Sequence, residues 1–233
     1  MSLERIDYAH GDVALTGWLA RPEGSPRGAI LVLPTIANFN AAMGQRAQML
    51  ADQGFVAMVA DFYGEPVASF EASFPLGNAL RENVDHYRGR LKAGLDALAA
   101  AAPGLTLSAI GYCMGGQAAL ELAREGAPIV LAASFHGILA TGRPATAETP
   151  VKARILVCHG DADPLVPREQ VLDFWKEMDA AGGNWHFHAY AGVKHGFTDP
   201  ESEARGKDFL GYNASADRQS WLALTALLDE VYN

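Results

Sequence analysis

Gly111-Tyr112-Cys113-Met114-Gly115-Gly116 is the stretch of sequence that decides how this chain folds. A strand-like apolar run, 105–110, precedes it, and a helix-like run, 117–124, follows it. Small residues two places before and two places after a nucleophilic side chain, set between a strand and a helix, are typical of a sharp turn that exposes the nucleophile. Glycine suits these places because the strand and the helix approach each other closely there. We therefore predict that Cys113 stands at the carboxyl end of a sheet.

Cys113 has two interpretations, a buried structural thiol and a nucleophile. Free cysteine is among the most buried residue types, so the structural interpretation is the usual one. Here a helix is predicted to begin just after Cys113, so its free N–H groups and the positive end of its dipole face the sulfur. Both favour the thiolate, the reactive form of cysteine, and we expect a nucleophile. Cys158 lies in the continuous apolar run 155–159 and is expected to be core.

Length and composition predict one α/β domain over residues 1–233, because the chain is 49% hydrophobic. The net charge of −9, from 27 acidic and 18 basic residues, argues against a nucleic-acid or anionic-membrane surface. Two cysteines make no disulfide framework, and a required thiol fits a reducing compartment. Residues 1–5 lack the basic start and apolar run of a signal peptide, and no apolar stretch is long enough to span a membrane. We expect a cytoplasmic monomer or homodimer.

Strand-like and helix-like segments alternate along the chain, which predicts a mainly parallel sheet with helices on both faces. The expected strands are 6–10, 13–20, 29–33, 55–60, 105–110, 129–135, 154–159 and 185–190. The expected helices are 41–54, 78–101, 117–124, 168–181 and 215–232. Residues 61–77 are expected to be irregular, with Asn78 as the cap of the helix that follows, and 192–213 are expected to form a loop.

A cysteine nucleophile needs a base and a group that orients the base. In folds with this type of turn the chain order is nucleophile, acid, histidine, and Asp163 and His195 supply that order. Each follows a predicted strand, and the carboxyl ends of parallel strands meet at one edge of the sheet. Asp161 competes with Asp163 for the role of the acid, although hydrogen bonds within its own loop would also explain it.

The oxyanion hole is expected to use the backbone N–H of Met114 and that of Ile36, in the loop 34–38. His136 ends a strand near Cys113 and is expected to line the pocket. The histidines are scattered and match no metal-ligand spacing, so we expect no metal site.

With these residues in place, the chain resembles the dienelactone hydrolases, the cysteine branch of the α/β-hydrolases. The likeness covers nearly the whole chain and rests on 111–116, on the turn 163–167, on His195-Gly196-Phe197 and on Asp61-Phe62-Tyr63. The resemblance implies an α/β-hydrolase fold without a large cap, a triad, an acyl-enzyme thioester and no cofactor. The triad that it implies is Cys113, His195 and Asp163.

Two positions depart from the pattern of the family. Its best-known members carry a glutamate in the oxyanion loop that pairs with the resting cysteine, whereas this chain has Thr35. Thiol activation is therefore expected through direct pairing with His195. The family also places a carboxylate-binding arginine four residues after the histidine, where this chain has Asp199. An acid there would repel an anionic substrate. A second arginine has no clear match, and the candidates are Arg81, Arg88 and Arg90.

The leading hypothesis is a hydrolase of neutral carboxylic esters or lactones. The alternative, since relatives in this family show such promiscuous activity, is a phosphotriester hydrolase that uses the same cysteine. A glutaminase-type amidotransferase would need glutamate two residues after the histidine, where this chain has Phe197. A non-catalytic binding module on the same fold remains, and the reactivity of the thiol would distinguish it.

The residues expected to line the substrate pocket are Thr35, Ala37, Phe39, Phe62, Tyr63, His136 and Asp199. Phe70, Phe74 and Trp185 are further aromatic candidates. For each of these three, and for Phe39, Phe62 and Tyr63, packing in the core or in a loop is at least as good an explanation.

Overall fold

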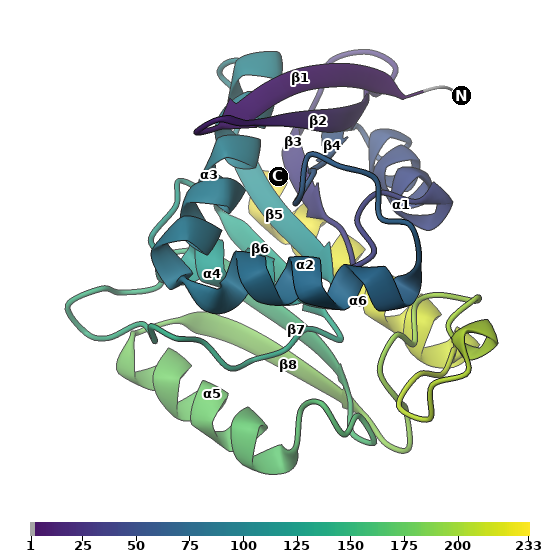
Figure 1. Ribbon diagram of the computed structural model, residues 1–233. Helices are drawn as coiled ribbons and strands as arrows, with labels where there is room; N and C mark the ends of the chain where they lie inside the picture. Colours follow the sequence, from purple (N-terminus) through teal and green to yellow (C-terminus); the bar gives the residue numbers. More distant parts are fainter. Residues whose placement is uncertain (1–2) are drawn as a thin grey trace.

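One eight-stranded sheet organises the computed structural model, which describes residues 3–233 (Figure 1). Met1 and Ser2, part of the segment expected to lack a signal peptide, lie outside the described residues. The strands are β1 (Glu4–His10), β2 (Val13–Ala20), β3 (Gly28–Leu33), β4 (Phe55–Val59), β5 (Leu107–Tyr112), β6 (Leu131–Phe135), β7 (Arg154–Gly160) and β8 (Asn184–Tyr190). The helices are α1 (Ala41–Ala51), α2 (Phe70–Glu82), α3 (Val84–Ala101), α4 (Met114–Arg124), α5 (Arg168–Ala180) and α6 (Ala214–Tyr232), with a short 3₁₀ turn η1 (Glu203–Arg205).

The order of the strands in space is β1-β2-β4-β3-β5-β6-β7-β8. The pairs β1–β2 and β2–β4 are antiparallel, and every other neighbouring pair is parallel. The predicted mainly parallel α/β fold is therefore confirmed. The chain passes from β3 to β4 on one side and later returns to β5 on the other side of β3. A reversal of this kind leaves a crevice at the carboxyl ends of the strands, which is where open α/β sheets bind ligands.

The core lies on both faces of the sheet because the central strands are apolar along their whole length. In β3, Ala29, Leu31 and Leu33 pack on one face, and Ile30 and Val32 pack on the other. This alternation is the two-residue period of a strand. Helices α2, α3, α4 and α5 cover the first face, in front of the sheet in Figure 1, and α1 and α6 cover the second.

The segment before β5 differs from its prediction, because it forms two helices and not one. Ser69 caps α2 by accepting a hydrogen bond from the backbone N–H of Ala72 at 3.2 Å. Asn83 ends α2 in an extended conformation and caps α3, where its side chain accepts from the N–H groups of Asp85 and His86. The expected cap at Asn78 is therefore wrong. Pro75 lies inside α2 and is a poor helix former, which hides this helix in the sequence.

No helix within residues 3–233 combines the length and the apolar character that crossing a bilayer requires.

Candidate active site

The turn between β5 and α4 holds Cys113 in a strained backbone conformation, with φ 56° and ψ −118°. A positive φ is unusual for a residue with a side chain, and such strain costs about 1–3 kcal/mol. Three glycines allow the close backbone contacts that hold Cys113 in this conformation. A Cβ atom on Gly111 would overlap the carbonyl oxygen of Gly115, and one on Gly115 would overlap the carbonyl oxygen of Leu33. A Cβ on Gly116 would lie 2.6 Å from Ser134 Oγ. The predicted turn is thus present, and glycine is required at each of the three places.

Five neighbouring strands deliver candidate residues to the same edge of the sheet. Thr35 follows β3, Cys113 follows β5, His136 follows β6, Asp163 follows β7 and His195 follows β8. Because these strands are parallel neighbours, their carboxyl ends bring together residues that lie up to 160 positions apart in the chain.

Asp163 holds the imidazole of His195. The distance between Asp163 Oδ2 and His195 Nδ1 is 2.7 Å, and the two residues are only 3% and 2% exposed. The other carboxylate oxygen, Oδ1, accepts a hydrogen bond from the backbone N–H of Leu165 at 2.9 Å. Asp161 lies outside this arrangement, because it forms a two-point ion pair with Arg168 at 2.6 and 2.9 Å. Of the two competing carboxylates, the structure brings Asp163 to the histidine.

The thiol of Cys113 and the imidazole of His195 shift each other's pKa. Burial acts to raise the pKa of Cys113, but the charge of His195, hydrogen bonding with it and the N–H groups of Ile36 and Met114 outweigh burial and lower that pKa. Burial acts to lower the pKa of His195, but the thiolate and Asp163 raise it to about 10. Within residues 3–233, the buried His195 Nε2 has no well-aligned hydrogen-bond partner. The two pKa shifts favour a thiolate–imidazolium pair over two neutral groups.

The two expected oxyanion donors, Ile36 and Met114, lie against this sulfur, and tyrosine hydroxyls hold both residues in place. Tyr63 donates to the carbonyl of Ile36 at 2.9 Å, and Tyr87 donates to the carbonyl of Met114 at 3.2 Å. Gly77 of α2 packs directly on both, since a Cβ there would lie 2.7 Å from the Ile36 side chain. Sequence reasoning missed Tyr87, because only the fold brings α3 beside α4.

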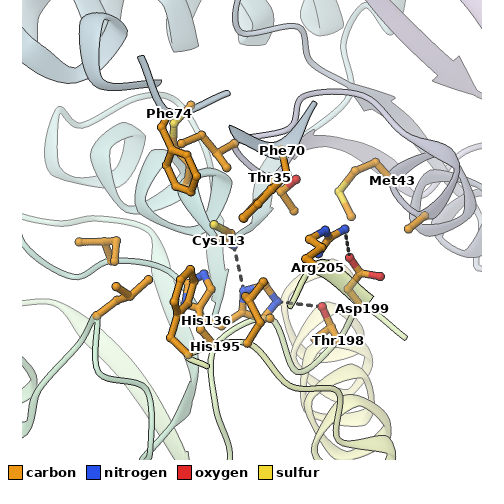
Figure 2. Close-up of a pocket in the computed structure, with 18 of the residues that line it drawn as sticks. Thr35, Met43, Phe70, Phe74, Cys113, His136, His195, Thr198, Asp199 and Arg205 are labelled. Atoms are coloured by element: carbon orange, nitrogen blue, oxygen red, sulfur yellow. Dashed lines mark hydrogen bonds and ion pairs between the residues drawn. The ribbon is translucent and has the colours of Figure 1, made fainter. Parts of the chain in front are cut away.

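A cavity of about 330 Å³ opens beside Cys113 and His195 (Figure 2). Thr35, His136 and Asp199 line it, together with Phe70 and Phe74 of α2. The other lining residues are Ile36, Ala42, Met43, Arg46, Arg81, Cys113, Met114, Ile138, Leu165, His195, Gly196, Thr198, Arg205, Phe209 and Leu210.

Four residues expected in the pocket lie elsewhere, and these assignments are corrected. Ala37 lines a separate surface depression, and Phe39 stacks on Trp18 with ring centroids 4.1 Å apart. Phe62 is buried core, and Tyr63 is used to hold Ile36. Trp185, a further aromatic candidate, stacks on Trp175 away from the cavity.

The charges of the cavity also differ from the expectation. Asp199 does not face the cavity as an unpaired acid, because Arg205 binds it at 2.5 Å and lines the cavity beside it. Of the three candidate arginines, Arg88 pairs with Glu121 and Arg90 donates to the carbonyl of Phe62. Arg81 lines the cavity and donates to the backbone carbonyl of Gly77 and to the side chains of Asn78 and Gln117. Within residues 3–233, Arg81 has no carboxylate partner.

Within the described part of the chain, no group of three or more histidine, cysteine, aspartate or glutamate side chains is arranged to hold a metal ion.

The model of the dienelactone hydrolase family matches residues 15–232. The chain belongs to this family. An uncharacterised protein of Caenorhabditis elegans is 36% identical over 148 residues, which cover 61% of this chain and 92% of that protein. A probable 2-oxo-3-(5-oxofuran-2-ylidene)propanoate lactonase from Bradyrhizobium sp. is 28% identical and covers 95% of this chain and 91% of its own.

Solved dienelactone hydrolase-like structures share the whole fold. The promiscuous phosphotriesterase P91 from metagenomic libraries is 33% identical, has a TM-score of 0.89, and covers 99% of this chain and 98% of its own. Membership of the family, predicted from the sequence, is confirmed.

The ion pair predicts that iodoacetamide alkylates one cysteine. The rate for Cys113 is expected to rise with pH through a pKa below that of an ordinary thiol, since only the thiolate reacts. His195→Asn removes the positive charge but leaves the burial, so the apparent pKa should increase and the rate at pH 7 should fall. Cys158 is the internal control, because burial raises its pKa to about 12. Mass spectrometry of the labelled peptides measures both sites, and equal labelling of the two cysteines would contradict the ion pair.

Proposed function

We propose that this protein hydrolyses carboxylic esters and lactones through an acyl-enzyme thioester on Cys113. The observation that carries the proposal is the arrangement of one buried Asp163–His195 pair beside a thiol whose pKa is lowered. A structural cysteine needs neither an imidazolium nor two backbone N–H groups directed at its sulfur. The family match and the lactonase relative support a hydrolase of lactone or ester bonds.

In the first half of the reaction, the Cys113 thiolate attacks the carbonyl carbon of the substrate. The carbonyl oxygen becomes an oxyanion, which accepts hydrogen bonds from the N–H groups of Met114 and Ile36. When the intermediate collapses, the C–O bond of the ester breaks and the His195 imidazolium gives its proton to the leaving alkoxide. In a lactone, this alcohol stays attached to the acyl group. The acyl group is then bound to sulfur as a thioester.

In the second half, His195 is neutral and accepts a proton from water as that water attacks the thioester. The same two N–H groups stabilise the second oxyanion. When this intermediate collapses, the C–S bond breaks and the carboxylic acid leaves. The sulfur of Cys113 is then again a thiolate beside the protonated imidazole of His195. Asp163 keeps the ring oriented through Nδ1 and stabilises its positive charge in both halves.

Replacing the nucleophile tests the proposal. Cys113→Ala should lower kcat/KM for p-nitrophenyl acetate and for a five-membered lactone by about three orders of magnitude or more, because the covalent route is lost. Cys158→Ala is the matched control and should retain turnover. Release of p-nitrophenol and pH-stat titration of lactone opening measure the two reactions. Turnover by Cys113→Ala at the wild-type rate would rule out the proposed mechanism.

Hydrolysis of phosphotriesters is the second candidate function, and the 33% identical phosphotriesterase P91 favours it. An uncharged triester fits a cavity whose lining includes Ile138, Leu165 and Phe74. The thiolate would displace the aryloxide from phosphorus, and the aryloxide would take the proton of His195. Water that gives a proton to His195 would then break the S–P bond, which releases the dialkyl phosphate and restores the thiolate. Paraoxon turnover in the presence of a metal chelator should appear in the wild type and disappear in Cys113→Ala. Turnover that the chelator abolishes would point to a contaminating metalloenzyme and against this second function.

The cavity is not restricted to neutral substrates, because Asp199 is already neutralised and Arg81 has no carboxylate partner among the described residues. The name of the Bradyrhizobium relative describes a lactone with a propanoate group. We therefore extend the proposed substrates to esters and lactones that carry a carboxylate near Arg81.

A pair of esters with and without this charge tests the role of Arg81. Arg81→Met should lower kcat/KM for mono-p-nitrophenyl glutarate by about tenfold or more relative to methyl p-nitrophenyl glutarate, since a charged hydrogen bond contributes about 1.5–3 kcal/mol. Arg168→Met is the control, because Arg168 pairs with Asp161 outside the cavity. An equal change for both esters in Arg81→Met would show that the arginine does not recognise charge.

A further inference from the structure

His136 connects the backbone of the nucleophile to Thr198 across the cavity wall (Figure 2). Its Nδ1 lies 3.1 Å from the backbone nitrogen of Cys113, and its Nε2 lies 2.9 Å from Thr198 Oγ1. The ring is 2% exposed and packs edge-on against His195, with ring centroids 5.1 Å apart. The ester-hydrolysis mechanism leaves this second buried imidazole without a task.

The backbone N–H of Cys113 fixes the tautomer of His136. A backbone N–H can only donate, so the Nδ1 that faces it carries a lone pair. The same N–H also donates to the carbonyl of Phe135, at 3.0 Å. It is the donor in both contacts, so Nδ1 is still the acceptor. The proton of the neutral ring is then on Nε2, which donates to Thr198 Oγ1. Burial, and then the charges of His195 and Arg46, hold the pKa of His136 well below its ordinary value, so the ring stays neutral.

The hydroxyl of Thr198 therefore has one lone pair occupied and its own proton available. No hydrogen bond donated by Thr198 Oγ1 occurs within residues 3–233. The backbone of Thr198 is held in place, because its carbonyl accepts from Arg46 at 3.0 Å and Arg46 is paired with Asp217 at 2.7 Å. Thr198 is 6% exposed and lines the cavity, so the hydroxyl borders the space that the substrate would occupy.

We propose that Thr198 is a specificity-determining residue, whose hydroxyl, oriented by His136, donates a hydrogen bond to a second oxygen of the substrate beside the scissile carbonyl. This deepens the proposed function and rests on it. The substrate class is then esters and lactones that carry an additional ether, carbonyl or carboxylate oxygen. A purely hydrocarbon acyl group would leave this buried hydroxyl proton without an acceptor, and such a loss is costly.

Matched pairs of esters that exchange one CH₂ for an oxygen isolate this hydrogen bond. The pairs are p-nitrophenyl methoxyacetate with butyrate, and p-nitrophenyl 3-methoxypropionate with valerate. Thr198→Val keeps the shape but removes the donor. In at least one pair, Thr198→Val should lower kcat/KM for the ether ester about three- to tenfold more than for the hydrocarbon ester. This is the range of effects expected from the loss of one neutral hydrogen bond. Thr198→Ser should keep the ratio of the wild type. Thr225→Val, on the exposed side of α6, is the control for the substitution itself.

Protection of Cys113 against iodoacetamide gives the same comparison without turnover. The matched probes are methoxyacetamide with butyramide, and 3-methoxypropionamide with valeramide. In the wild type, the ether amide of at least one pair should protect at about three- to tenfold lower concentration than the hydrocarbon amide. Thr198→Val should remove this difference. If the amides protect Cys113 in this way but the protein hydrolyses no ester, the proposed function fails and the role of Thr198 stands. Equal effects of Thr198→Val on both members of both pairs, or the same ratio in the Val and Ser variants, would overturn the inference.

Discussion

The close approach of β5 and α4 at Cys113 is the constraint on which the rest of the site depends. Gly111, Gly115 and Gly116 let backbone meet backbone where no Cβ would fit, and Cys113 is forced to a positive φ between them. The turn places the sulfur at the first N–H groups of α4 and within reach of His195. Any side chain at these glycines would displace the helix, and with it the Met114 N–H that the proposed reaction uses.

Burial and charge oppose each other around this sulfur. Removal from water disfavours both a thiolate and an imidazolium, so either group alone would be neutral at this depth. Together they stabilise each other, and Asp163 adds a negative charge on the far side of the ring. Thr35 stands where the resemblance to the family implies a glutamate, so in the proposed mechanism direct pairing with His195 would activate the thiol without that acid.

The sequence predicted those parts of the site that depend on local patterns and on the order of strands. The glycine turn, the placement of Asp163 and His195 after successive strands, and the loop that carries Ile36 all follow from residues close together in the chain. Contacts between distant segments could not be predicted. Arg205 neutralises Asp199 from the short 3₁₀ turn η1, in a segment with no periodic pattern, and Tyr87 reaches Met114 only because α3 packs beside α4. The two-helix arrangement was missed for a different reason, since Pro75 inside α2 argues against a helix there and so conceals the cap at Asn83.

Helix α2 is separate from α3 because of the break at Asn83, and it presents Phe70 and Phe74 to the cavity. Its firm attachment to the oxyanion residues is at Gly77, whereas the two phenylalanines lie one and two turns earlier, on a stretch where Phe74 is 36% exposed. Substitution of the two phenylalanines would therefore change the lining of the cavity while the contact of Gly77 with Ile36 and Met114 is kept. The part of α2 that shapes the cavity is thus separate from the part that supports the groups of the proposed reaction.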